Sequence, residues 1–481
     1  MKFSLQLPAV ENWKFWIFIA LIFRIALFYF CLTEFKDADQ HYKGSPMLCT
    51  GDTELYLEPI EHLISAGTYA DDFRMPGYGF IYFLLRLILN PLVSLYVIGF
   101  LQVLLSAISV YCLALICKTI LKSRTAFLIA YFLFLASTFT AVYDAFLLTE
   151  SLCTSFLIFS FYFLTKPSLN RSAIFLAGLF TTWSIFLRPI ILPVILIQAL
   201  YMFFIFRGES IKRQSLNILC FLILFIVAEG SWTIRNALKY QQFIPLTKTG
   251  IYHPNTLGTY DYELSLFCRA IGEWEPGVEI DPDLHTSSRF KESNLIAIPI
   301  DCYTSKFNAD SLRQLIAAKN QMLSENNSRE AKAAENELIL TKLHSYTNSI
   351  KEEKPFEYYF KSRIRAVKRY FFHSGSYKLF GRPFNDLNGF EKTFKVLSSL
   401  LYYFVFVVGA LGILFLLVTG IKTKNKLSVL MASTAMYLSL VCPLILKLSE
   451  SRFFVPAYPL FIVGIATIIA QLKTRMDATN Q

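Results

Sequence analysis

The stretch VLSSLLYYFVFVVGALGILFLLVT (Val396–Thr419) decides the class of fold to which this chain belongs. It contains no charged residue, and it is long enough to cross the roughly 30 Å hydrocarbon core of a bilayer as one helix. It does not alternate between apolar and polar residues, as a strand of a membrane barrel does. The stretch therefore predicts a transmembrane helix.

Similar apolar runs recur along the chain, so we predict roughly ten transmembrane helices in all. The other predicted spans are Trp13–Leu32, Pro91–Cys117, Ala126–Thr140, Phe146–Leu164, Ala173–Leu187, Ile190–Phe206, Leu216–Trp232, Leu427–Leu446 and Phe453–Leu472. The composition agrees, because only 17% of the 481 residues are charged, against about 25% in soluble domains. The expected fold class is an all-α polytopic membrane protein.

The basic loops predict the orientation of these helices. Lys and Arg concentrate at Lys118–Arg124, Lys166–Arg171, Arg207–Arg213, Lys422–Lys426 and after Lys473, which fall on one side if every span crosses once. Cytoplasmic loops carry this excess, so both termini are expected in the cytoplasm. The net charge of +11 then reflects topology, and we expect no nucleic-acid partner. The first span has no small-residue cleavage site after it and is interpreted as a retained helix.

Three regions follow from this topology. Residues 1–234 form an N-terminal membrane region with a first outer loop at 33–90, residues 235–395 an outer, mostly helical module, and residues 396–481 the last membrane helices with a short tail. Within the module, the apolar residues of Leu312–Leu323 recur at helical spacing. A second such run, Ala334–Tyr346, follows after the cap Ser328, and the two runs predict a helical hairpin. The amphipathic stretch 355–372 either lies in the lipid headgroup region or packs on the module as a solvated helix.

The first outer loop, GDTELYLEPIEHLISAGTY (Gly51–Tyr69), contains the first candidate site residues. Its apolar residues recur at helical spacing, beginning with Tyr56, and predict an amphipathic helix that starts at Asp52. Asp52 is either an N-cap or a catalytic carboxylate. Glu54, Glu58 and Glu61 are expected to face solvent. Arg74 follows where the chain re-enters the membrane.

Further ionisable residues are expected on the same outer face. They are Asp144 and Glu150 in VYDAFLLTES, Arg235 and Lys248 after the span that ends at Trp232, and Glu450 and Arg452 at the last helix pair. Structural alternatives exist, since Asp144 suits a helix N-terminus and Arg235 suits a snorkelling side chain beside Trp232. Ionisable residues near membrane depth are nevertheless candidates for function.

Carboxylates and arginines that share an outward face suit one kind of chemistry. Arginine holds a phosphate and stabilises its charge as the phosphate leaves, and a carboxylate accepts a proton from an attacking hydroxyl or amine. A polyprenyl-phosphate sugar presents such a phosphate at the membrane surface. Cysteine spacing shows no CxxC pair or Cys/His cluster, so no metal site is predicted. Cys49, Cys268 and Cys302 all face outward, and the sequence leaves their pairing open.

The motifs resemble the GT-C superfamily of integral membrane glycosyltransferases, in particular the bacterial branch related to protein O-mannosyltransferases and the lipid A aminoarabinose transferase. The similar elements, in family order, are Arg24, GDTELY, Gly67 with Tyr69, the RMPGY run from Arg74, LTESL, LRP, WTIRN and ESRFFVPAYP (Glu450–Pro459). The resemblance implies a GT-C-like bundle. It also implies a bacterial inner membrane location with the active site facing the periplasm.

The resemblance also implies an activity and roles for the candidate residues. The enzyme would transfer a hexose or pentose from undecaprenyl or dolichyl phosphate to a lipid, glycan or protein acceptor, with inversion at the anomeric carbon. Asp52 would be the catalytic base, in competition with Asp37 and Asp39. Glu150 would be the second catalytic residue and would position the sugar or the acceptor. The substrate-binding candidates are Tyr56, Asp144 and Glu450, together with Arg74, Arg235, Lys248 and Arg452, which would bind the phosphate. Whether a divalent metal takes part stays open.

Three other functions are compatible with the same residues. A transporter or flippase of lipid-linked sugars would also have charges in the membrane, but the internal repeats or paired broken spans of transporters are not evident. A polymerase or ligase would use a polyprenyl-diphosphate glycan as donor. A scaffold protein would tolerate Asp52→Asn and Arg235→Ala without loss of activity.

Overall fold

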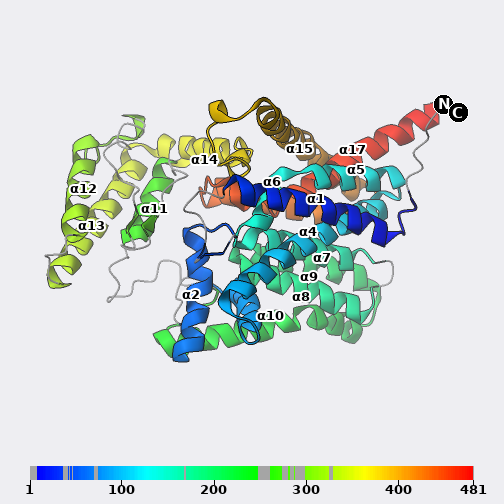
Figure 1. Ribbon diagram of the computed structural model, residues 1–481, viewed down its shortest axis with the longest axis horizontal. Helices are drawn as coiled ribbons and strands as arrows, with labels where there is room; N and C mark the ends of the chain where they lie inside the picture. The colour runs from blue at the N-terminus through cyan, green and yellow to red at the C-terminus, as the bar shows by residue number, and fades with distance from the viewer. Residues whose placement is uncertain are drawn as a thin grey trace. The chain divides into compact units, whose positions relative to one another are not determined.

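A computed structural model describes residues 8–35, 42, 44–45, 47–69, 74–166, 169–246, 260–272, 280–281, 286–287, 298, 300–323 and 329–479. Helices make up nearly all of the regular structure in these ranges, as Figure 1 shows. The strands described are β1 (Ile280–Asp281) and β2 (Thr286–Ser287), which form one short antiparallel pair. The predicted all-α class is confirmed.

The apolar helices correspond to the ten predicted spans. Within the described residues, those long and apolar enough to cross a membrane are α1 (Trp13–Glu34), α4 (Pro91–Leu121), α9 with its flanking turns (Pro189–Gly208), α10 (Ile211–Tyr240), α15 (Gly389–Lys422) and α16 with the π-helical turn η9 (Lys426–Ile445). Three shorter apolar helices are α7 (Thr149–Leu164), α8 (Arg171–Leu187) and the Tyr458–Lys473 part of α17 (Tyr458–Thr479). The chain is a polytopic membrane protein.

One predicted span is not a single straight helix. The span Ala126–Thr140 is a bent pair, because α5 (Arg124–Ala136) meets α6 (Thr138–Ala141) and the 3₁₀ turn η1 (Val142–Ala145) at an angle of 52°. Ser137 separates the two parts with an extended backbone. The break directs residues 142–148 away from the line of α5, so the next span begins at Thr149 and not at Phe146.

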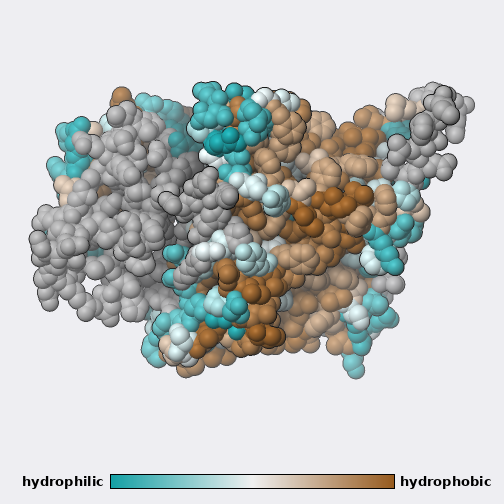
Figure 2. Space-filling view, viewed as in Figure 1, coloured by the Kyte–Doolittle hydropathy of each residue, from teal (hydrophilic) through white to brown (hydrophobic). Residues whose placement is uncertain are grey.

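The chain divides into two compact units. Unit 1 comprises residues 1–247, 374–438 and 452–481, and unit 2 comprises residues 248–373 and 439–451. In unit 1, α7 packs against α8 and α15 packs against α17. Many large apolar side chains of this unit are exposed, among them Phe18, Ile226 and Leu411, and Figure 2 shows the hydrophobic surface as a broad brown area over the helices. The predicted domain boundaries at 235 and 395 stay predictions.

Unit 2 is helical and has its own core. It contains α11 (Tyr260–Ile271), α12 (Ala309–Leu323), α13 (Arg329–Glu353), the π-helical turn η6 (Glu357–Lys361) and α14 (Ser362–Phe371). Helices α12 and α13 pack together, which confirms the predicted hairpin, although its cap Ser328 lies outside the described residues. Phe267, Phe307 and Leu343 are buried in the core, and so are Cys268 and Cys302.

A glycine allows α3 (Gly77–Arg86) to approach α8. A Cβ atom on Gly77 would lie 2.4 Å from the backbone carbon of Phe186, so no larger residue fits without moving a helix. At the same contact, Nε1 of Trp183 donates a hydrogen bond to the Gly77 carbonyl oxygen, at 3.1 Å. The Gly-Tyr sequence after Pro76 therefore serves close packing of two helices.

Gly77→Ala is expected to lower the free energy of unfolding of the purified protein by about 2 kcal/mol or more, and with it the melting temperature, because overpacking against a rigid backbone forces the helices apart. Gly230→Ala is the matched control. Gly230 lies inside α10, and a Cβ atom there would meet no other atom within 4 Å, so alanine should be neutral or stabilise by up to about 1 kcal/mol. Equal melting temperatures for the two variants would contradict the packing argument.

Candidate active site

The first outer loop forms the predicted helix, α2 (Gly51–Ala66). Its N-cap is Thr50, and the Thr50 amide donates to Oγ1 of Thr53 at 3.0 Å. Asp52 lies in the first turn and is not the cap, so the capping interpretation of Asp52 is wrong. The carboxylate of Asp52 is consequently available for interactions outside its own helix.

Backbone pairing holds this loop against the segment that leads into α7. Leu48 forms a parallel bridge with Phe146: the Leu48 amide donates to Ala145 O at 3.0 Å, and the Leu147 amide donates to Leu48 O at 2.8 Å. The Thr53 hydroxyl also donates to Leu147 O, at 3.0 Å. These bonds bring the start of α2 close to the start of α7.

Two arginines hold the Asp52 carboxylate. Nη2 of Arg74 pairs with Oδ1 of Asp52, and Nη1 of Arg452 pairs with Oδ2. Burial by itself raises the pKa of Asp52, but Arg452 and Arg74 outweigh burial and hold this pKa well below its usual range. Asp52 is therefore ionised at neutral pH, and both of its oxygens face a guanidinium.

A second ion pair extends this cluster into the protein. Oε1 of Glu150 lies 2.9 Å from Nη1 of Arg188 and 4.0 Å from Nη1 of Arg452. Glu150 is 1% exposed and Arg188 is 7% exposed, so this pair is buried. The charges thus alternate in a row, Arg74, Asp52, Arg452, Glu150 and Arg188, which we call the charge row. Three guanidiniums and two carboxylates give it a formal charge of +1 (3 − 2).

Aromatic rings lie against this row. The Arg74 guanidinium is 5.4 Å from the ring centre of Tyr56, a buried side chain of α2. The Phe453 ring lies 4.6 Å from the Arg188 guanidinium and 5.6 Å from that of Arg452. The face of an aromatic ring attracts a guanidinium at such distances. Tyr56 therefore belongs to the same cluster as the predicted cations.

Arg188 is absent from the predicted site residues, although the motif LRP contains it. The available signal was an arginine directly after the apolar run Ala173–Leu187, at its outer end. Arg188 is the C-cap residue of α8, and its backbone is extended, so its side chain does not follow the helical arrangement of the residues before it. Only the folded structure brings it to Glu150.

Asp144 lies in a neighbouring polar network. Its Oδ1 accepts a hydrogen bond from Ser151 at 2.5 Å, and the buried Arg24 interacts with it electrostatically. Gln102 donates to the backbone oxygens of Asp144 and Phe146, at 3.0 and 2.9 Å, while Tyr78 donates to Gln102 at 2.8 Å. These bonds hold the segment to which Leu48 is paired. A role of Asp144 in substrate binding stays a prediction.

Other predicted cations and acids have different surroundings. Arg235, near the end of α10, donates to Tyr69 O at 2.9 Å and to Asn236 Oδ1 at 2.8 Å, and lies 4.8 Å from the Trp232 ring. Both interpretations of Arg235, a snorkelling side chain and a phosphate ligand, stay predictions. Glu450 belongs to unit 2. Lys248, Asp37 and Asp39 lie outside the described residues.

Glu61 does not simply face solvent as expected. Nε and Nη2 of Arg86 donate to its two carboxylate oxygens at 2.7 and 3.1 Å, and the Tyr82 hydroxyl donates to Oε1 at 2.5 Å. This paired contact joins α2 to α3, and so it helps to fix the orientation of the helix that contains Asp52. An isolated Glu in an amphipathic pattern does not reveal its partner, which lies 25 residues further along the chain.

Within the described residues, no three His, Cys, Asp or Glu side chains lie close enough together to hold a metal ion. Both oxygens of Asp52 are paired with arginines. We therefore derive no step through a metal.

Comparison with known proteins finds no matching family model and no matching curated protein. Among solved structures, the fold is similar to that of an Archaeoglobus fulgidus oligosaccharyltransferase solved with zinc and sulfate (12% identity, TM-score 0.45, covering 95% of this chain and 51% of that chain). It is also similar to AglB of the same organism, solved with an inhibitory peptide and a dolichol-phosphate (13% identity, TM-score 0.47, covering 97% and 52%). A third similar structure is ArnT from Cupriavidus metallidurans (12% identity, TM-score 0.34, covering 94% and 78%).

The chain spans about half the length of the archaeal oligosaccharyltransferase chains. Two of the three similar structures are oligosaccharyltransferases. Since all three TM-scores lie below 0.5, the assignment of a function rests on the site residues.

Proposed function

We propose that this protein is a membrane glycosyltransferase that transfers a sugar from a polyprenyl-phosphate donor to an acceptor on the outer face of the membrane. The observation that carries the proposal is the charge row, in which Asp52 lies between Arg74 and Arg452. The row provides both groups that such a transfer needs: a carboxylate to accept the proton of the acceptor, and guanidiniums to bind the phosphate.

The charge balance favours an anionic ligand. Two of the three arginine side chains, Arg74 and Arg452, are partly exposed at 34% and 23%, whereas Arg188 is buried and paired with Glu150. An approaching phosphate therefore meets the outer two arginines first. Arg188 adds positive charge behind them. One guanidinium can donate two parallel hydrogen bonds to the oxygens of a phosphate group, so a phosphodiester suits this site.

Donor binding would also activate Asp52. As the phosphate takes hydrogen bonds from Arg74 and Arg452, those arginines interact less with Asp52, and the basicity of its carboxylate rises. Asp52 then accepts the proton of the acceptor hydroxyl or amine while that atom attacks the anomeric carbon. The bond from this carbon to the phosphate oxygen breaks on the opposite side, its electron pair leaves with polyprenyl phosphate, and the configuration inverts. Arg74 and Arg452 stabilise the charge that forms.

The finer assignment is part of the same proposal. The donor is an undecaprenyl- or dolichyl-phosphate hexose or pentose, and the acceptor is a lipid, glycan or protein. The protein resides in a bacterial inner membrane with both termini in the cytoplasm. One protein of similar fold, AglB, was solved with a dolichol-phosphate.

The test is an assay of the purified, full-length protein with radiolabelled polyprenyl-phosphate hexose and a membrane extract as the source of acceptors. Release of polyprenyl phosphate together with transfer of label is the expected result. A transporter or flippase would move the labelled donor across a proteoliposome membrane without cleaving it. A polymerase or ligase would cleave only a polyprenyl-diphosphate donor. Either result would overturn the proposal.

A further inference from the structure

The helix at residues 356–371 packs on unit 2 by an unexpected face. Its buried side chains are Glu357, Ser362, Ala366, Tyr370 and Phe371. A glycine of α11's C-terminal turn, Gly272, makes close approach possible, because a Cβ there would lie 2.5 Å from Ser362 O. Tyr358 also packs against the core of unit 2, whereas Phe356, Phe360 and Ile364 remain mostly exposed.

Those apolar residues form an exposed stripe. Phe356, Phe360 and Ile364 are 61%, 61% and 64% exposed, at intervals of four residues, and Tyr359 beside them is 42% exposed. The Phe356 and Phe360 rings are stacked, with centres 5.4 Å apart. The helix packs on the module, as one alternative from the sequence expects, but it does so without burying this stripe, and its location in the headgroup region stays a prediction. The stripe is presented outward.

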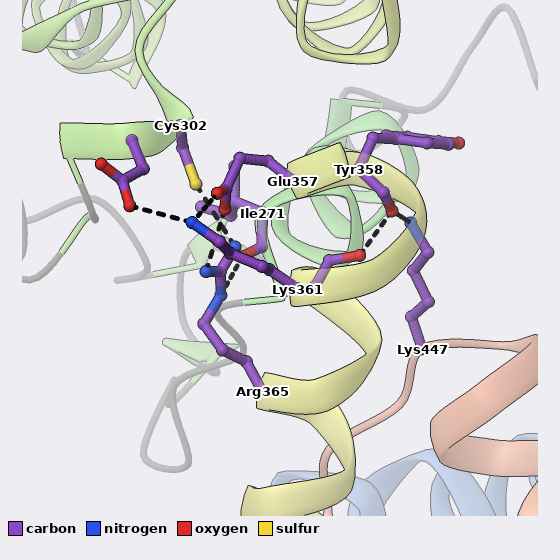
Figure 3. A network of polar contacts seen from close by, with 9 residues as sticks. Ile271, Cys302, Glu357, Tyr358, Lys361, Arg365 and Lys447 are labelled. Atoms are coloured by element: carbon purple, nitrogen blue, oxygen red, sulfur yellow. Dashed lines mark hydrogen bonds and ion pairs between the residues drawn. The ribbon is translucent and has the colours of Figure 1, made fainter. Parts of the chain in front are cut away.

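A polar network holds the segment in this orientation, as Figure 3 shows. Lys361 and Arg365 both pair with Glu357, whose carboxylate is buried. Nε of Arg365 also donates to Ile271 O at 2.9 Å, which ties α14 to α11. The acid of the segment is thus neutralised inside. Nζ of Lys361 also lies 3.2 Å from Oδ2 of Asp301, and Lys368 is an exposed cation of the same segment.

The same segment is bonded to the end of a membrane span within unit 2. Nε of Arg363 donates to Leu444 O at 2.8 Å, and Nζ of Lys447 donates to Tyr358 O at 2.5 Å, a contact visible in Figure 3. Leu444 lies in the last turn of the candidate span Lys426–Ile445. Ile445, the last residue of that span, is 70% exposed. The segment that carries the apolar stripe is therefore bonded to the end of a candidate membrane span.

Positive charge is concentrated where the segment contacts the end of the span Lys426–Ile445. The pKa of Lys447 is lowered to about 8, first by burial and then by Arg363 and Arg365. Anionic lipid headgroups attract such clusters, and aromatic residues prefer the same depth of the bilayer.

We infer that residues 356–368 form a lipid-binding surface, with Phe356, Phe360 and Ile364 inserted at the headgroup boundary and the adjacent cations against anionic headgroups. Through this surface, unit 2 binds to the bilayer. It is separate from the charge row and does not depend on the proposed reaction.

The experiment measures tryptophan quenching by brominated lipid in nanodiscs that contain the full-length protein. Phe360→Trp places a reporter in the stripe, and Leu338→Trp is the matched control, because Leu338 on α13 is also apolar and exposed, at 44%. The emission of the parent protein, with its five tryptophans, is subtracted. Both substitutions are at exposed positions, and circular dichroism verifies that each variant is folded.

We expect brominated lipid to reduce the added Phe360→Trp emission by about twofold or more, since the ring lies at the acyl boundary, and to leave that of Leu338→Trp unchanged. Replacing anionic by zwitterionic lipid should weaken the quenching of Phe360→Trp. No quenching of Phe360→Trp, or equal quenching of both reporters, would overturn the inference. So would quenching that is indifferent to headgroup charge. Emission that changes with protein concentration and not with bromination would assign the stripe to contact between two copies of the chain.

Discussion

Asp52→Asn is expected to lower the rate of sugar transfer by about 10²- to 10⁴-fold, the usual contribution of a general base. The change removes the proton acceptor but keeps the size of the side chain, so helix α2 and its pairing with residues 145–147 should survive. The asparagine amide also cannot pair with both arginines as the carboxylate does. Initial rates with labelled polyprenyl-phosphate hexose provide the measurement.

Glu54→Gln is the control, because Glu54 lies in the same first turn of α2 and has the same charge. It should retain nearly full activity. A loss in Glu54→Gln equal to that in Asp52→Asn would indicate a general need for negative charge in the loop and would contradict the role of Asp52.

The pH dependence follows from the direction of the pKa shift. Since the folded-state pKa of Asp52 lies below its value of about 3.9 in an unfolded chain, its ion pairs stabilise the protein at all higher pH values, and this stability is lost only as the pH falls through the folded pKa. The activity of the free enzyme should accordingly show no loss from protonation of Asp52 between about pH 5 and 7. A steep acid-side loss near pH 6 in the parent protein that is absent from Asp52→Glu would argue against this electrostatic account.

Glu150→Leu is expected to destabilise the protein by about 3–5 kcal/mol, because it leaves the buried Arg188 without its carboxylate partner. Arg188→Met should cost a similar amount for the opposite reason. The double variant should regain most of the stability of the parent, since two apolar side chains replace a buried ion pair at little cost. Thermal unfolding of the three variants in detergent measures the effect.

Activity separates the structural role of this pair from its chemical role. The double variant should fold but transfer sugar poorly, because the charge row then lacks its inner cation and carboxylate. Arg213→Met is the control: Arg213 pairs with Glu209 at the surface, is 67% exposed, and should contribute about 0.5 kcal/mol or less. If the loss in free energy of unfolding of the double variant equals the sum of the losses of the two single variants, then Glu150 and Arg188 act independently. The pair would then not form the core of the charge row.

Sequence by itself determined that the chain is a polytopic membrane protein and where its apolar helices lie, whereas the predicted number of roughly ten spans stays a prediction, since six of these helices within the described residues, or seven with the bent pair, are long enough to cross. Long uncharged runs such as 396–419 predict a helix wherever they occur, because in lipid each backbone amide must bond within its own segment. The helix of the first outer loop and the hairpin of unit 2 were also predictable from local apolar spacing. The break at Ser137 was not, because continuous hydrophobicity does not reveal a change in helix direction.

Tertiary structure alone decided which charged residues meet. Asp52, Arg74 and Arg452 were all candidates in the sequence, but their ion pairs join positions up to 400 residues apart, and spacing along a chain contains no information on such partners. The same holds for Arg188, which meets Glu150 only because α8 ends beside α7. It holds again for the stripe of Phe356, Phe360 and Ile364. Amphipathic periodicity shows that a helix has an apolar face, while only the packing of Ser362 and Ala366 shows that this face remains outside.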